Sequence, residues 1–96
     1  MVGLDGQKMM KKLENCMKQN EWKMEDLQES IAKNRKSLID ELRTLAGRLE
    51  EDETRKVYES DVSWINTYVK RIGEAEEAIK ALHEQQMVLK YIAEKE

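Results

Sequence analysis

The chain has 96 residues and a net charge of -3; 40% of its residues are hydrophobic, 39% are charged, and it contains four Gly and no Pro or Phe. This length allows one domain at most, the scarcity of turn residues excludes a β-sandwich or barrel, and no apolar run approaches the roughly 18 residues of a membrane span. The first residues, MVGLDGQKMMKK, lack the apolar core of a secretory signal peptide, so we expect an all-α cytoplasmic protein that either stays in the cell or is exported with a partner.

Residues 6–46 are predicted to form one long helix, because apolar side chains recur there at heptad spacing. The a positions of this seam are Met10, Met17, Met24, Ile31, Leu38 and Leu45, and two of its d positions are Leu13 and Leu27. An a/d seam sustained over about five heptads is typical of a coiled-coil helix. After residue 38 the stripe widens through Leu42 and Leu49, which indicates packing on more than one neighbour.

Two d positions of the first seam carry amides, Asn20 and Asn34. Either these side chains face solvent at the rim, or they hydrogen-bond across the seam and fix its register at some cost in stability. In the second case, Asn34→Leu is expected to raise thermal stability and to broaden the range of oligomeric states.

The chain is expected to turn at Leu45-Ala46-Gly47, with the tip over about residues 47–53. Gly just past a helix adopts the left-handed conformation at little steric cost. The acidic residues 50–53 then suit the positive start of a second helix, for which Asp52 or Thr54 is the expected cap.

Residues 54–94 are predicted to form the second helix. Its seam consists of Ile65, Tyr68, Ile72, Ala75, Ile79, Leu82, Gln86, Leu89 and Ala93. Ile72 and Ile79 keep one phase across Gly73, so we interpret the helix as continuous; a third helix beginning near Gly73 is the alternative. Together the elements predict an antiparallel two-helix hairpin of coiled-coil type.

The two halves of the chain differ in charge. Residues 1–48 hold ten Lys/Arg and eight Asp/Glu (+2), and residues 49–96 hold seven and twelve (-5). Arms of opposite sign suit a chain that folds back on itself. Neither half clusters its cations as a phosphate-binding surface does, so we expect no nucleic-acid partner.

A lone hairpin of this size is expected to need a partner, because two helices bury only a stripe along each other. Six large apolar residues fall outside the a/d seams: Trp22, Ile39, Trp64, Met87, Val88 and Ile92. Exposed apolar patches mark interaction surfaces, and we expect a four-helix bundle formed by homodimerisation or with another helical protein. The residues expected to contact the partner are Met10, Leu13, Met17, Met24, Leu27, Ile31, Leu38, Ile65, Tyr68, Ile72, Ile79, Leu82 and Leu89.

The sequence offers little for catalysis or metal binding. His83-Glu84-Gln85-Gln86-Met87 begins like the HExxH zinc motif, but Met87 stands where the second imidazole is needed. Cys16 lies beside the first seam, and we interpret it as a small apolar filler rather than a reactive thiol. We expect no cofactor, no metal and no enzymatic activity.

With its length, hairpin and mid-chain Gly, the chain resembles the small WXG-type helical hairpins of type VII secretion. Those proteins turn at Trp-x-Gly, where this chain has Leu45-Ala46-Gly47, with Leu45 in place of Trp. Their export tail is a Tyr followed four residues later by an acid, whereas Tyr91 is followed there by Lys95. The chain is therefore most similar to the motif-less helical partners of LXG-type toxins.

The resemblance implies a targeting factor or chaperone that binds the helical N-terminal domain of a type VII secreted toxin and aids its export. Two other functions suit the same features. One is a structural coiled-coil subunit of a larger assembly, and the other is a chaperone of a flagellar or type III-like export system.

Overall fold

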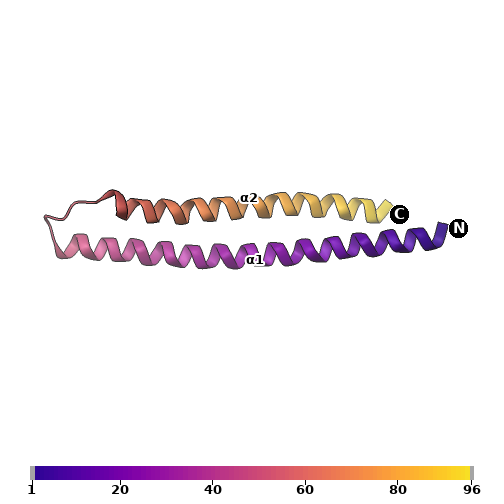
Figure 1. The fold of residues 1–96 in the computed structure, drawn as a ribbon, viewed down its shortest axis with the longest axis horizontal. Helices are drawn as coiled ribbons and strands as arrows, with labels where there is room; N and C mark the ends of the chain where they lie inside the picture. Colours follow the sequence, from indigo (N-terminus) through magenta and orange to yellow (C-terminus); the bar gives the residue numbers. More distant parts are fainter. Residues whose placement is uncertain (1, 96) are drawn as a thin grey trace.

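The computed structural model describes the backbone of residues 2–95 and the side chains of residues 6–95. Two helices, α1 (Val2–Glu51) and α2 (Glu59–Lys95), run antiparallel and pack on each other as a hairpin (Figure 1). The molecule is a rod of 79 × 16 × 15 Å. The predicted all-α hairpin is confirmed, and α2 continues through Gly73 without a third helix.

The predicted position of the turn is wrong. Leu45 and Gly47 lie within α1, which continues to Glu51, and the connection is residues 52–58. No Gly in the described chain has a positive φ, so Gly47 does not act as a left-handed helix cap. Good helix formers on both sides, such as Ala46 before it and Leu49 after it, let the helix continue at a cost of about 1 kcal/mol for the Gly.

The first helix ends at Glu51, and Asp52 begins the connection. The Asp52 amide still donates to the Arg48 carbonyl at 3.2 Å, but the next turn is closed by the Arg55 amide donating to the Asp52 carbonyl at 3.1 Å. Oδ1 of Asp52 accepts from the Thr54 amide at 3.0 Å and from the Thr54 hydroxyl at 2.7 Å. This side chain-to-backbone bonding competes with the helical pattern and favours a turn.

The second helix begins with Tyr58 at the N-cap. The Tyr58 carbonyl accepts from the Asp61 amide at 3.0 Å, and Oδ2 of Asp61 accepts from the Tyr58 amide at 3.0 Å. A side chain at the third helical position that reaches back to the N-cap amide is one half of a capping box. The expected caps, Asp52 and Thr54, therefore belong to the turn and not to α2.

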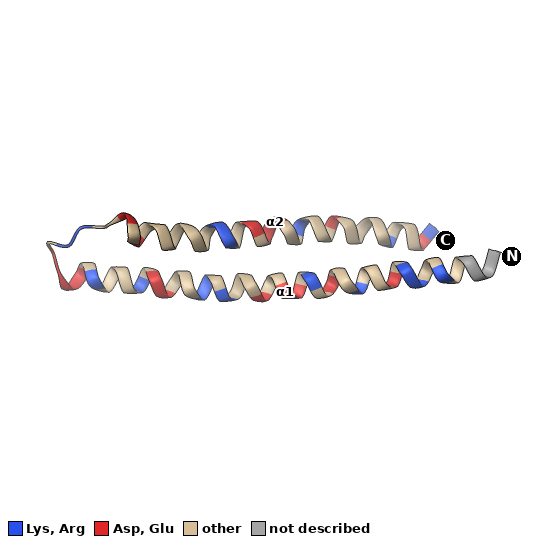
Figure 2. Cartoon of the chain, viewed as in Figure 1, with Lys and Arg blue, Asp and Glu red and all other residues tan. Residues whose placement is uncertain are grey.

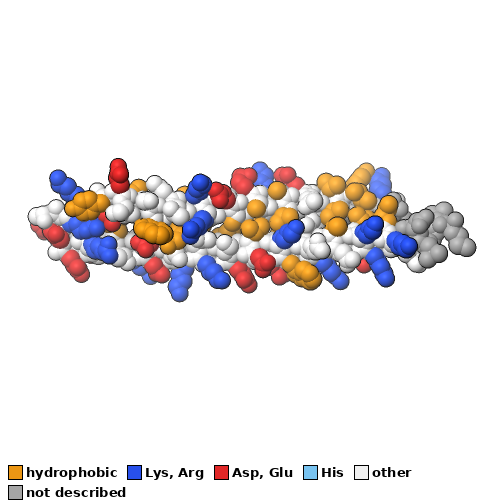
Figure 3. Space-filling view, in the orientation of Figure 1, with side chains coloured by type: hydrophobic (Ala, Val, Ile, Leu, Met, Phe, Trp, Pro, Cys, Tyr) orange, Lys and Arg blue, Asp and Glu red, His pale blue; other side chains and the backbone are white. Residues whose placement is uncertain are grey.

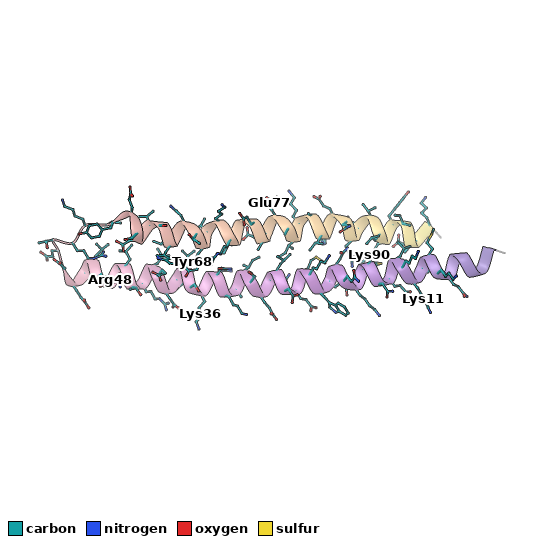
Figure 4. The ribbon with its side chains drawn as sticks, in the orientation of Figure 1. Lys11, Lys36, Arg48, Tyr68, Glu77 and Lys90 are labelled. Atoms are coloured by element: carbon teal, nitrogen blue, oxygen red, sulfur yellow. The ribbon has the colours of Figure 1, made fainter. Side chains whose placement is uncertain are left out.

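The heptad periodicity of both helices is confirmed by burial. The a and d residues of the two predicted seams are half-buried or buried, with the exceptions of Glu41 and Arg48, at two exposed d positions of α1. Tyr68 lies between the helices, whereas Lys36 and Glu77 point away from the facing helix (Figure 4). The side-chain period therefore places one stripe of each helix against the other, as a coiled-coil seam requires.

The seam is too narrow to make a core. Among residues 6–95, Ala75 is the one buried apolar residue, at 7% exposure, and the two other buried residues are Asn20 and Gln86. The chain exposes 8049 Å², whereas a compact monomer of this mass exposes about 5,700 Å². The hairpin thus leaves a large part of its surface uncovered by its own chain.

Candidate interaction surfaces

The thirteen residues predicted to contact a partner lie first of all between the two helices of the hairpin. All of them are half-buried, so each packs partly on the opposite helix and keeps part of its surface accessible. The ring of Tyr68 also stacks on Trp64, with centroids 6.3 Å apart. These residues therefore form the intramolecular seam, and a further helix would complete their burial.

Asn20 and Gln86 form a polar layer across the seam. Nδ2 of Asn20 donates to Oε1 of Gln86 at 3.4 Å, and Nε2 of Gln86 donates to the Met17 carbonyl at 3.1 Å. Both side chains are 6% exposed. For Asn20, the hydrogen bond across the seam proposed from the sequence is present.

Asn34 behaves differently from Asn20. Its Nδ2 donates to the Ser30 carbonyl at 2.8 Å and lies 3.3 Å from the Ser30 hydroxyl, within its own helix. Because the helices are antiparallel and Asn20 faces Gln86, a step of two heptads along both places Asn34 opposite Ile72. With no amide across the seam, Asn34 turns back to its own backbone, as Asn side chains in helices do.

The exposed apolar residues carry the clearest signal of interaction. All six that fall outside the predicted seams are exposed by more than a third: Trp22 63%, Ile39 43%, Trp64 55%, Met87 61%, Val88 59% and Ile92 39%. The structure adds seven others: Met9, Leu42, Val57, Tyr58, Val62, Val69 and Tyr91. The heptad pattern missed several of these because they lie one position outside the a/d stripe.

Four of these residues form a patch near the free end of α2. Met87, Val88, Tyr91 and Ile92 are one and four residues apart, so they share one face of the helix. We call them the open-end patch. Figure 3 shows apolar side chains gathered over this end of the rod. Contiguous apolar surface of this kind is typical of a binding site on a soluble protein.

The charged side chains contribute little to holding the two helices together. In Figure 2 both signs are interspersed along α1 and α2. The ion pairs among the described residues are Arg55–Asp61, at 3.2 Å, and Lys70–Glu74, at 3.9 Å, and neither joins α1 to α2. The expected attraction between a cationic and an anionic arm is therefore not made through direct ion pairs.

Arg55, Tyr58 and Asp61 form a cluster at the tip. Nη2 of Arg55 donates to both carboxylate oxygens of Asp61, at 3.2 and 3.3 Å, and the guanidinium lies 5.6 Å from the Tyr58 ring centroid. The Tyr58 amide, and then the Arg55 guanidinium, lower the pKa of the Asp61 carboxyl below its usual value. The Thr54 hydroxyl and amide lower the pKa of Asp52 in the same way. These bonds set the conformation of the connection.

The residues considered for chemistry remain apart. Cys16 is exposed, so the expectation that it fills an apolar space is wrong. His83 is also exposed. Among the side chains of residues 6–95, no three His, Cys, Asp or Glu gather as metal ligands would.

Comparison with family profiles, curated proteins and solved structures finds no match for this chain. Within the described residues, neither helix holds an apolar stretch long enough to cross a bilayer.

Proposed function

We propose that the chain is a non-enzymatic interaction module whose hairpin packs against further helices, giving a helical bundle. The observation that carries this proposal is the near absence of buried apolar side chains along a two-helix rod, with Ala75 the exception among residues 6–95. The uncovered seam and the exposed aromatic residues gain burial only when another helix lies on them. Burial of each large apolar side chain contributes about 1.5–3 kcal/mol.

The finer proposal concerns the partner. The length, the hairpin and the mixed-charge surface suit a targeting factor that binds the helical N-terminal domain of a toxin exported by type VII secretion. The hairpin supports this proposal, whereas Leu45–Gly47 does not, because that segment is helical and the turn lies at residues 52–58. The open-end patch is the proposed contact for such a domain, since an amphipathic helix presents a matching apolar face.

Co-expression with the helical N-terminal domain of an LXG-type toxin encoded by a neighbouring gene tests the proposal. We expect the two to copurify as a helical complex, and Val88→Glu or Tyr91→Glu to abolish the copurification. Ser63→Glu, at an exposed position of α2 away from the patch, is the matched control and should leave it intact. If the control variant also lost binding, or if the patch variants kept it, the contact with the toxin domain would lie elsewhere on the chain.

One alternative is favoured by shape. A rod 79 Å long with a tip at one end suits a spacer or scaffold subunit in a larger assembly. That function predicts stable association with a long coiled coil and none with a toxin domain, so the same purification separates the two.

A further inference from the structure

A second apolar stripe runs along the tip half of α1, beside the seam. It consists of Ala32, Ile39, Leu42, Ala46 and Leu49. The last four alternate at three- and four-residue spacing, and Ala32 lies seven residues before Ile39, with Arg35 between them. Ile39 and Leu42 are 43% and 45% exposed. A helix with two such stripes is built to pack on two neighbours, and α2 occupies only the first stripe.

α2 adds further apolar side chains on the same flank of the seam. Val62 and Val69 occupy e positions of α2, and Leu42 and Leu49 occupy e positions of α1. In an antiparallel pair the e positions of both helices lie on one flank of the seam. Val62 and Val69 are 41% and 53% exposed. We call this flank, with its charged continuation described next, the lateral face.

Toward the open ends of the helices, the lateral face becomes charged, with both signs on each arm. The charged residues at the b and e positions of α1 there are Lys11, Glu14, Lys18, Glu21 and Glu25, and those of α2 are Glu76, Lys80, Lys90 and Glu94, with His83 beside them; all of them are exposed. None of these residues takes part in the ion pairs found within the described residues. Each arm therefore offers charges that the hairpin itself does not pair.

We propose that the lateral face binds the same face of a second copy of this chain, with both tips at the same end and the two-fold axis parallel to the rod. A two-fold rotation about this axis keeps the direction of the rod and exchanges the sides on which its two helices lie. In the dimer, α1 of one copy therefore lies against α2 of the other. The contact goes beyond the proposed function and leaves the open-end patch largely free for a different protein.

The register of the seam shows what would meet in that arrangement. Because Asn20 lies level with Gln86, Leu42 lies within two residues of the level of Val62, and Glu25 lies within one of Lys80. Apolar side chains of one copy then face apolar side chains of the other at the tip. At the open end, Glu14 lies within two residues of the level of Lys90, and Lys11 within one of the level of Glu94, so each meets an opposite charge on the second copy.

The opposite orientation matches poorly. If the second rod overlapped the first with its tip at the other end, the apolar tip half of each copy would lie on the charged half of the other. The Leu42 region would then meet Glu14 and Glu21 or their basic counterparts, and charged groups would be desolvated without a partner. Charge and apolar surface therefore both favour tips at one end.

The area is sufficient for a stable dimer. A face of a rod measuring 79 × 16 × 15 Å gives an interface of the order of 2,000 Å² in total, which is within the range of obligate dimers. The resulting four helices would alternate in direction around a common axis, as in up-down bundles.

Cysteine cross-linking tests both the contact and its direction. In a Cys16→Ser background, Leu42→Cys and Val62→Cys are placed on separate chains, which are then mixed and oxidised; we expect a disulfide-linked heterodimer. Leu42→Cys mixed with Glu21→Cys is the control for the reversed orientation, in which α1 lies against α1, and should link at least tenfold less. A Leu42→Cys chain that links efficiently to itself would place α1 against α1 and overturn the proposal.

Charge reversal provides a second, independent measurement on the uncross-linked chain. In sedimentation equilibrium we expect Glu25→Lys or Lys80→Glu to weaken dimerisation about tenfold, since each change acts twice in a symmetric dimer, and the double variant to recover it. Glu77→Lys, which changes an outward-pointing side chain (Figure 4), is the matched control. A monomer at all concentrations overturns the proposal, and it leaves the proposed function standing if the toxin domain still copurifies.

Discussion

The side-chain amide of Asn20 donates to the side-chain carbonyl of Gln86 at 3.4 Å, linking α1 to α2 where both helices carry an amide. Gln86 also donates to the Met17 carbonyl at 3.1 Å, so both ends of its amide are used. A slip of one heptad would move Asn20 away from Gln86 and bury both amides against apolar residues. A satisfied polar layer of this kind specifies the register of a coiled coil at some cost in stability.

The two seam asparagines should respond oppositely to one substitution. Asn34→Leu is expected to raise the free energy of unfolding by about 1–2 kcal/mol, because Leu packs on Ile72 and the lost bond to Ser30 lies within one helix. Asn20→Leu is expected to lower it by about 1–3 kcal/mol, since Gln86 loses a buried partner. Urea titration followed by circular dichroism measures both changes.

The double variant Asn20→Leu/Gln86→Leu serves as the control for the polar layer. It should recover the stability lost in Asn20→Leu, because neither amide is left without a partner. If Asn20→Leu alone stabilised the hairpin as much as Asn34→Leu does, the hydrogen bond to Gln86 would have no energetic role.

Heptad spacing predicted the fold because the side-chain period alone decides which stripe of a helix is buried. It left the roles of Asn20 and Asn34 open, because a d position does not reveal which residue lies across the seam. The turn was misplaced because the Gly47 signal is local, and the flanking helix formers outweigh it. The actual turn depends on Asp52, and the start of α2 on Asp61; both make contacts that only the folded connection brings together.

Replacing the helical glycines should stabilise the hairpin. Gly47 and Gly73 lie within helices, have no positive φ, and an added Cβ at either would meet no atom within 4 Å. Gly47→Ala and Gly73→Ala are each expected to add about 0.5–1 kcal/mol to the free energy of unfolding. Thermal denaturation measures the gain.

Ala46→Gly is the matched control for the glycine variants and should lose a similar amount, because it is the reverse change beside Gly47. A destabilised Gly47→Ala would show that the chain bends at that residue, as a turn there requires.

The thiol of Cys16 should react in the folded state. Because its side chain is exposed, we expect alkylation by iodoacetamide at nearly the same rate in buffer and in denaturant, with the progress followed by mass spectrometry. Cys16→Ser should accordingly change the free energy of unfolding by less than about 0.5 kcal/mol. Strong protection in buffer would mean that a second copy or another protein covers this position.

Stability of the tip should fall in acid through Asp61. The Tyr58 amide and Arg55 hold the pKa of this carboxyl below its ordinary 3.8, so the folded state favours the charged form. The stabilisation is complete above the ordinary pKa and is lost as the pH falls through the lowered value. Hydrogen exchange of the first turn of α2, followed by NMR between pH 6 and 3, should show protection decreasing at the acid end.

Asp61→Asn removes the charge and keeps a carbonyl that can accept from the Tyr58 amide. In this variant, the first turn of α2 should be less protected from hydrogen exchange at pH 6 than in the natural chain, because the bond to Arg55 is weakened. The difference in protection should shrink toward pH 3, as the natural carboxyl gains its proton. Glu53→Gln, which removes a charge from the same connection, is the control, because Glu53 forms none of the ion pairs seen among the side chains of residues 6–95. A difference independent of pH would mean that Asp61 acts through its shape and hydrogen bonding alone, and that its charge contributes nothing to closing the tip.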